Sequence, residues 1–278
     1  LSEVPTLLQV RKLTKSFPGV KALSEVDFQV RAGEVHALMG ENGAGKSTLI
    51  KVLTGVYQRD GGEALMGNQS INPRSPEEAQ SLGISTVYQE VNLIPHLSVA
   101  ENICLGRQKT KLGFLKWKEI RQRAEKALSR LGIAIDVTET VANYSIGLQQ
   151  LVAIGRALDL SARLLILDEP TSSLDEKEVA TLFGVMRKLK AEGLGIVFVT
   201  HFLDQVYEIS DRITVLRNGT FVGEFEAAKL PRIQLISKMV GKELSESDFK
   251  STARLRLDKG EPPLLQLKKI GRKNALQP

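Results

Sequence analysis

The sequence predicts an α/β protein with a mostly parallel sheet, an antiparallel β subdomain and a helical insert. Three observations lead to this fold class. Apolar strands alternate with amphipathic helices after residue 160, the order found in parallel sheets. The first forty residues show strands separated by turn signals, and residues 91–142 carry apolar residues at helical spacing.

The N-terminal region is expected to hold three strands. Residues 7–13 form an apolar run, and Val26, Phe28 and Val30 alternate with polar residues as in a half-buried strand. Residues 34–39 predict a buried strand that enters a glycine-rich loop, and residues 47–53 predict a helix.

The glycine-rich loop satisfies the phosphate-loop pattern GxxxxGK[ST] without a gap. Its residues are Gly40, Glu41, Asn42, Gly43, Ala44, Gly45, Lys46, Ser47 and Thr48. The glycines let backbone N–H groups approach phosphates, the lysine supplies a positive charge, and the serine hydroxyl can bind magnesium. A strand before the loop and a helix after it make this a nucleotide-binding site of the phosphate-loop NTPase kind.

The later elements follow in order along the chain. One helix face in the insert is expected to comprise Trp117, Ile120, Ala124, Leu128 and Leu131. Strands are expected at residues 164–167 and 195–200, with a helix between them whose face comprises Val179, Leu182, Phe183, Met186 and Leu189. Residues 212–224 predict a hairpin that turns at Asn218 and Gly219.

Two carboxylates follow the strand at residues 164–167. Asp168 and Glu169 are expected at its carboxyl end, where open parallel sheets bind ligands. We expect Asp168 to hold magnesium and Glu169 to deprotonate the attacking water.

Together with Lys46 and Asp168, further motifs make residues 7–241 resemble the ATP-binding cassette (ABC) ATPases. Gln89 matches the glutamine loop of that family, the segment from Tyr144 to Gln150 its signature loop, Asp175 its aspartate loop and His201 its switch histidine. The resemblance implies a helical subdomain over about residues 91–155. It also implies ATP and Mg²⁺ as cofactors.

The resemblance also implies roles for individual residues. It implies catalytic roles for Glu169, His201, Gln89 and Lys46, and magnesium binding by Ser47, Gln89 and Asp168. It implies ATP contacts from the loop Gly40–Thr48, from Phe17 and, across a dimer, from Ser145, Gly147 and Asp175. Two of these residues have structural alternatives, since Asp175 and Glu178 make a helix capping pair and an isolated Phe17 is more often a core residue.

The signature loop departs from the family pattern Leu, Ser, Gly, Gly, Gln. Here it runs Tyr144, Ser145, Ile146, Gly147, Leu148, so the serine is kept while one glycine and the glutamine are lost. Since cassettes of this family pair head to tail, with ATP hydrolysis only in that arrangement, the change is expected to impair the site built on the partner's phosphate loop. Similar asymmetry in tandem cassettes is typical of bacterial importers of ribose, galactose or galactofuranose.

The resemblance therefore implies an ATPase at the cytoplasmic face of the bacterial cell membrane that energises sugar import. Its implied partners are permease subunits, a second cassette and, indirectly, a sugar-binding protein. The alternative is an ABC-type ATPase that works as a switch on nucleic acid or ribosomes. The long coiled-coil insertion or charged linker of those proteins is not visible in the sequence, and intact Glu169 and His201 disfavour a switch without hydrolysis.

The C-terminal segment contains an internal repeat. Residues 264–270 (LLQLKKI) nearly repeat residues 7–13 (LLQVRKL), and the intervening stretch is polar with two prolines. We expect an ABC domain over residues 1–242, a linker over 243–263 and the start of a second ABC domain at 264–278.

Composition limits the remaining possibilities. Hydrophobic residues make up 42% of the 278 residues, no apolar run approaches the length of a membrane helix, and Cys104, the single cysteine, is expected to be a buried apolar residue. Much of the net charge of +6 lies between residues 107 and 130. That basic stretch is either a solvated helix face or a surface near anionic lipid or a partner, and no nucleic acid is expected.

Overall fold

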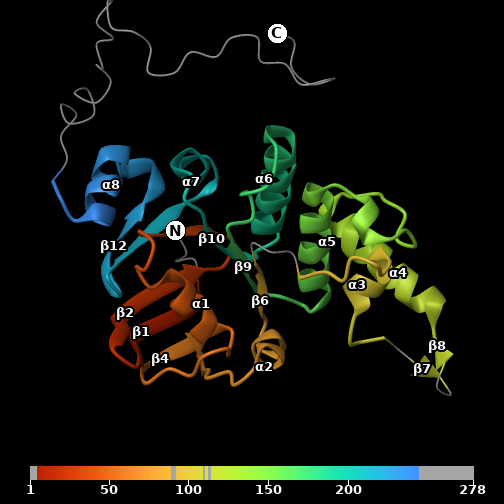
Figure 1. Cartoon of the computed structure of the whole chain (residues 1–278), viewed down its shortest axis with the longest axis horizontal. Helices are drawn as coiled ribbons and strands as arrows, with labels where there is room; N and C mark the ends of the chain where they lie inside the picture. Colours follow the sequence, from red (N-terminus) through yellow and green to blue (C-terminus); the bar gives the residue numbers. More distant parts are fainter. Residues whose placement is uncertain (1–4, 89–91, 109, 112–113, 244–278) are drawn as a thin grey trace, which may run out of the picture. The chain divides into compact units, whose positions relative to one another are not determined.

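The computed structural model describes residues 5–88, 92–108, 110–111 and 114–243. Its largest feature is a six-stranded sheet in the order β12-β11-β3-β10-β9-β6. These strands are β3 (Val35–Met39), β6 (Ile84–Val87), β9 (Leu164–Asp168), β10 (Gly195–Val199), β11 (Arg212–Arg217) and β12 (Thr220–Glu226). All neighbouring pairs are parallel except β11 with the edge strand β12, so the mostly parallel sheet is confirmed (Figure 1).

A second, four-stranded antiparallel sheet has the order β2-β1-β4-β5. It comprises β1 (Thr6–Phe17), β2 (Val20–Arg31), β4 (Gly61–Met66) and β5 (Gln69–Ser70), and the helix α2 (Pro76–Ser81) leads from it toward β6. The first two strands form a hairpin whose tip carries Phe17 and Val20 as paired residues. This sheet is the antiparallel β subdomain that the turn signals predict.

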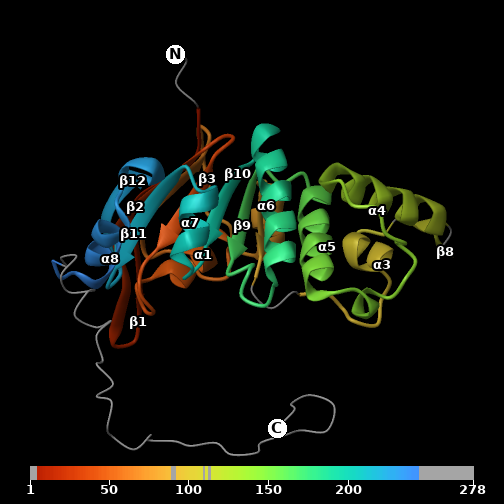
Figure 2. The ribbon, with the colours of Figure 1, turned by 90° about the horizontal axis from the view of Figure 1, so that it is seen from above.

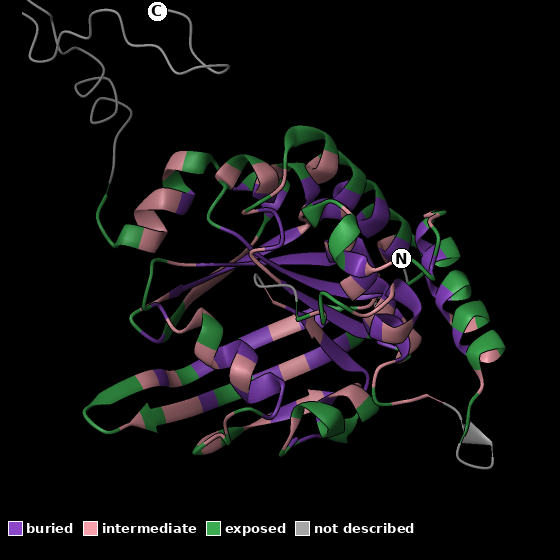
Figure 3. Cartoon of the chain, turned by 45° about the vertical axis from the view of Figure 1, so that its right-hand side comes forward, coloured by how far each residue is buried: buried purple, intermediate pink, exposed green. Residues whose placement is uncertain are grey.

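Alternating side chains of the parallel strands pack into different cores on the two faces of the sheet. In β9, Leu165 and Leu167 pack with α5 (Ile146–Asp159) and α6 (Glu176–Ala191), while Leu164 and Ile166 pack with α1 (Lys46–Leu53) and the antiparallel sheet. The strands are therefore buried on both faces, as Figure 3 shows in purple. A smaller core joins β3 and β11 to α7 (Leu203–Ile209), the 3-10 turn η2 (Ala227–Lys229) and α8 (Arg232–Val240).

The helical insert comprises α3 (Val99–Cys104), α4 (Trp117–Leu131), the 3-10 turn η1 (Val141–Asn143) and α5 (Figure 2). The predicted face of α4 is buried from Ile120 to Leu131, but Trp117 is 43% exposed. That part of the prediction is wrong because Trp117 is the first residue of α4, directly after the short hairpin of β7 (Thr110–Lys111) and β8 (Phe114–Leu115), which the sequence did not predict.

The turn between β11 and β12 has the conformation that its sequence predicts. Asn218 and Gly219 both have positive φ, 49° and 73°, as a two-residue hairpin turn requires. In the described part of the chain, no helix is long and apolar enough to cross a membrane. Gln89, most of the predicted linker and the predicted start of a second domain lie outside the described residues.

Candidate nucleotide-binding site

The loop between β3 and α1 is shaped by two glycines that no other residue can replace without a clash. A Cβ at Gly40 (φ 153°) would lie 2.3 Å from the carbonyl oxygen of Leu216 in the neighbouring strand. At Gly45 (φ 103°) it would lie 2.9 Å from the carbonyl oxygen of Ala22. The loop backbone therefore packs directly against β11 and the start of β2, which leaves its inner side open for phosphate.

Lys46 is held in place by the loop itself. Its ammonium group donates to the carbonyl oxygens of Gly40 at 2.7 Å and Glu41 at 3.0 Å. Burial lowers the pKa of Lys46, while the nearby carboxylates of Glu169 and Asp168 raise it in opposition. A partly buried cation between acidic groups and an open loop is well placed to meet additional negative charge.

Asp168 and Glu169 occupy the carboxyl end of β9, as the sequence predicts. Burial, and then the charge of Glu169, raises the pKa of the Asp168 carboxyl, against the lowering effect of Lys46. Glu169 has a φ of 49°, an unusual value for a residue with a side chain, and its N–H donates to Val199 of β10 at 2.8 Å. The chain thus holds Glu169 in a turned conformation that places its carboxylate beside that of Asp168.

His201 follows β10 and lies next to Glu169. Its Nδ1 is 3.3 Å from Oε2 of Glu169, and its ring contacts that of Phe202 at a centroid distance of 4.0 Å with the planes tilted by 40°. The ends of β9 and β10 are also linked through Gln205, whose side-chain oxygen accepts from the hydroxyls of Thr171 at 2.6 Å and Thr200 at 3.4 Å. The sequence does not predict a role for Gln205. The only sequence signal for it is its position in α7, four residues after His201.

These elements enclose a cleft of about 530 Å³. Of the predicted site residues, those that line it are Phe17, Asn42, Gly43, Ala44, Gly45, Lys46, Ser47, Thr48, Asp168 and Glu169. Phe17 is half-buried and packs edge-on against Tyr57 with a centroid distance of 5.1 Å, so it is a wall of the cleft rather than a core residue.

The sequence missed part of the cleft wall. Lys21, Ala22, Asn218 and Gly219 also line it. They come from two hairpins joined by a backbone hydrogen bond from the Ser24 N–H to the Gly219 carbonyl oxygen, and the Gly219 N–H in turn donates to the carbonyl oxygen of Ala44 in the phosphate loop. The residues Asn218 and Gly219 give a turn signal in the sequence, but nothing there indicates that the turn abuts the phosphate loop.

The donor set fits magnesium. The Ser47 hydroxyl and the Asp168 carboxylate both face the cleft, and hard oxygen atoms are the ligands that Mg²⁺ prefers. Within the described residues no cluster of three or more His, Cys, Asp or Glu is placed to hold a metal ion.

Ser145, Gly147 and Asp175 do not line the cleft. Ser145 caps the start of α5, and Asp175 caps α6 by accepting from the Glu178 N–H at 2.8 Å. The two caps meet at the Glu178 carboxylate, to which the Ser145 hydroxyl donates at 2.7 Å. The capping role predicted for Asp175 and Glu178 is therefore confirmed.

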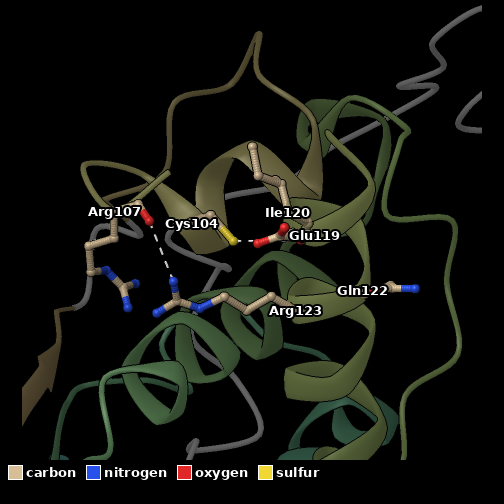
Figure 4. A pocket seen from close by; sticks show the side chains of 6 residues that line it. All are labelled: Cys104, Arg107, Glu119, Ile120, Gln122 and Arg123. Atoms are coloured by element: carbon tan, nitrogen blue, oxygen red, sulfur yellow. Dashed lines mark hydrogen bonds between the residues drawn. The ribbon is translucent and has the colours of Figure 1, made fainter. Parts of the chain in front are cut away.

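A smaller pocket of about 240 Å³ lies in the helical insert (Figure 4). Its lining includes Cys104, whose thiol donates to the Ile120 carbonyl at 3.6 Å. Burial raises the pKa of Cys104, so the sulfur remains a thiol and is a poor nucleophile. The predicted structural role of Cys104 is confirmed, since the residue is buried.

Part of the basic stretch between residues 107 and 130 is paired within the chain. Arg107 and Arg123 contact one carboxylate, Asp159, at 2.5 and 2.6 Å. Arg130 pairs with Glu192 at 2.8 Å. These ion pairs join α4 and the segment after α3 to α5, and join α4 to the residue after α6, which favours a structural role for this part of the stretch.

Comparison with known proteins assigns the chain to one family. A family model described as ABC transporter matches residues 23–172. A solved ATP-binding cassette of an ABC transporter is 28% identical, with a TM-score of 0.76 over 86% of this chain and 99% of that one. A dimeric cassette in a post-hydrolysis state bound to ADP and Pi is 27% identical, with a TM-score of 0.67 over 79% of this chain and 98% of that one.

Curated relatives match nearly the whole chain. The galactofuranose transporter ATP-binding protein YtfR of Escherichia coli is 51% identical over 98% of this chain and 54% of its own length. A ribose import ATP-binding protein of Rubrobacter xylanophilus is 49% identical over 98% of this chain and 53% of the relative. A fructose import ATP-binding protein of Bifidobacterium longum is 48% identical over 98% and 54%. The chain thus spans about half the length of the curated relatives it matches.

Proposed function

The chain belongs to the ABC transporter family as an ATP-binding cassette, and from this premise we propose that it hydrolyses ATP to energise import of a simple sugar. Sugar import is proposed from its similarity to the galactofuranose, ribose and fructose proteins. Its partners would be permease subunits that span the membrane and, through them, a sugar-binding protein. It would work at the cytoplasmic face of a bacterial cell membrane.

The observation that carries the ATPase proposal is the convergence of four charged or titratable groups at one sheet edge. Lys46 and Asp168 line the cleft together with Glu169, and His201 contacts Glu169. This is the set that phosphoryl transfer to water needs, because the reaction depends on charge stabilisation and on a placed base.

In the proposed reaction a water oxygen attacks the γ-phosphorus, the bond from that phosphorus to the bridging oxygen breaks, and ADP leaves. Glu169 accepts the proton of the water, while Lys46 and the N–H groups of the loop bind the phosphate oxygens. His201, which lies next to Glu169, is proposed to contact the γ-phosphate. Gln89 is proposed to sense the magnesium ion or the attacking water.

Ser47 and Asp168 would hold magnesium, which supplies neutralisation of the phosphate charge when bound. Phe17, at the end of β1, lines the same cleft, and its half-buried ring is proposed to stack on adenine.

We also propose that ATP hydrolysis here requires a second cassette. Ser145, Gly147 and Asp175 do not line the cleft with Lys46 and gather instead around Glu178. They are proposed to face the nucleotide of another cassette, head to tail. The similarity of residues 264–270 to residues 7–13, and relatives about twice as long, support a fused second domain after a linker. The altered signature then predicts one competent and one impaired ATP site.

The need for a second cassette is tested by measuring ATP turnover of this chain alone and in a titration with the separately expressed second cassette. We expect turnover to appear only when the second cassette is added, and to saturate when the two proteins are present in equal amounts. Full turnover by the chain alone, linear in its concentration, would contradict the need for a second cassette.

Sugar import needs its own measurement. Uptake of labelled galactofuranose, ribose and fructose is compared in cells that carry the complete importer with and without Lys46→Ala. We expect one of these sugars to accumulate only with Lys46 intact. Equal uptake of all three in both strains would favour the alternative, a switch without a permease.

A further inference from the structure

Glu178 of α6 lies at the start of α5 and accepts hydrogen bonds from two residues there. The Ser145 hydroxyl donates to its Oε1 at 2.7 Å, and the Gly147 N–H donates to the same oxygen at 3.2 Å. A carboxylate thus sits at the N-terminus of a 14-residue helix, where unpaired N–H groups and the helix dipole favour negative charge.

The backbone at this point makes room for that carboxylate. A Cβ on Gly147 would lie 2.6 Å from both Cδ and Oε1 of Glu178. Glycine at position 147 is therefore what allows the acid to reach the helix end. Space therefore restricts position 147 of the signature to glycine. The neighbouring position 146 carries no such restriction, since Ile146 is 51% exposed.

The other carboxylate oxygen is tied to the aspartate loop. Oε2 of Glu178 accepts from the Asp175 N–H at 3.2 Å, and the Glu178 N–H donates to Asp175 at 2.8 Å. The same loop returns to the cleft, because the Ser172 N–H donates to the carbonyl oxygen of Glu169 at 3.3 Å. The Glu178 side chain therefore connects the start of α5 to the aspartate loop, which in turn contacts Glu169.

We propose that Glu178 is a positioning residue that competes with the γ-phosphate of the facing cassette for Ser145 and Gly147. This inference rests on the proposed function, since it assumes that the start of α5 meets ATP bound to another cassette. The Ser145 hydroxyl has one proton to donate, and two anions at one helix end repel each other. Closure of the two cassettes then requires the Glu178 carboxylate to leave Ser145. When the Glu178 carboxylate moves, its hydrogen bond to the Asp175 N–H changes as well. The aspartate loop, which contacts Glu169 through Ser172, is therefore expected to shift with it.

Self-association of this chain tests the competition directly, because two copies bring Ser145 of one to the phosphate loop of the other. Both copies carry Glu169→Gln so that ATP persists, and analytical ultracentrifugation gives the ATP concentration at half-association. Glu178→Gln keeps a residue that can complete the capping box, but removes the charge. We expect this variant to associate at an ATP concentration about fivefold lower, the upper end for one partly exposed charge. Glu176→Gln, in the same helical turn, is the matched control and should change nothing.

A double-mutant cycle separates competition from a merely structural role. In a Ser145→Ala background, Glu178→Gln should lose most of its effect, because the hydroxyl for which the two anions compete is gone. An unchanged or higher ATP requirement in folded Glu178→Gln would overturn the inference while leaving the proposed function intact. If the Glu169→Gln reference binds ATP but never associates, the start of α5 does not bind ATP held by a second copy and the role of Glu178 is overturned, whereas the need for a second, different cassette is judged separately by the turnover titration.

Discussion

The phosphate loop and the start of α5 both present backbone N–H groups and a hydroxyl. They differ in whether the other groups of a nucleotide site come from the same chain. At the loop, Lys46 is fixed by two carbonyl oxygens, and the carboxylates opposite belong to the same chain. At the start of α5, the donors Ser145 and Gly147 face a carboxylate from α6 rather than the cleft.

The difference teaches which functions a single cassette can perform. Binding of nucleotide depends on groups that the fold of one chain brings together, so it should be measurable on this chain alone. In the proposed head-to-tail arrangement turnover depends in addition on the start of another α5, so changes there should leave binding by the single chain unaltered.

Glu169→Gln should lower the ATP turnover rate about a thousandfold, since a general base contributes a factor on the order of 10²–10⁴ to the rate. ATP binding should persist, because the amide keeps the shape of the side chain and Lys46 is untouched. Steady-state hydrolysis in the assembled protein and equilibrium ATP binding to the single chain measure the two effects. Glu226→Gln, an exposed acid paired with Lys229, is the control. Unchanged turnover in Glu169→Gln would remove this residue as the base.

Lys46→Ala should weaken ATP binding to the single chain by about a hundredfold, the upper range for a hydrogen-bonded charge. The ammonium group is partly buried beside the cleft, so water replaces it poorly. Isothermal titration with a non-hydrolysable ATP analogue gives the affinity. Lys51→Ala in the same helix is the matched control, since its ammonium group lies over the ring of Tyr57. Equal losses in both variants would show that general charge, rather than the loop geometry, binds the phosphates.

Much of the fold could be predicted from the sequence because its signals are local. The apolar runs in β9 and β10 and the Asn218–Gly219 turn depend on short-range chemistry that the residues themselves specify. The hairpin of β7 and β8 could not be predicted, because two-residue strands carry too little pattern. The exposure of Trp117 depends on where α4 begins, which helical spacing alone does not fix.

The site divides in the same way. Asp168 and Glu169 could be placed because strand ends of a parallel sheet share one edge. Lys21 and Gly219 could not, because they reach the cleft through tertiary packing of two hairpin tips against the phosphate loop. The contact of Glu178 with Ser145 is likewise invisible in the sequence, since it joins residues on two different helices.

Gly40→Ala should lower the free energy of unfolding by about 2–3 kcal/mol, through a backbone clash at a strained φ. The Cβ would meet the carbonyl oxygen of Leu216, which cannot move without disturbing β11. Gly43→Ala is the matched comparison, since Gly43 also has positive φ (83°) but no atom within 4 Å of a Cβ. Urea unfolding of both variants isolates the clash. Equal losses would mean that φ alone limits the loop.

Asp168→Asn should produce the smallest change, a gain of about 0.5 kcal/mol in the stability of the nucleotide-free chain at pH 7, as expected for one partly screened charge. Burial and Glu169 raise the folded-state pKa of Asp168 above its unfolded value, so the protonated form is favoured by folding. The stability that wild type gains from this proton is present below the unfolded pKa and is lost as pH rises through the folded pKa. The advantage of the Asn variant should therefore shrink on acidification, as urea unfolding at several pH values would measure. A less stable Asn variant at pH 7 would show that attraction to Lys46 outweighs burial, and the cleft would then be held together by its own charges rather than poised for magnesium and phosphate.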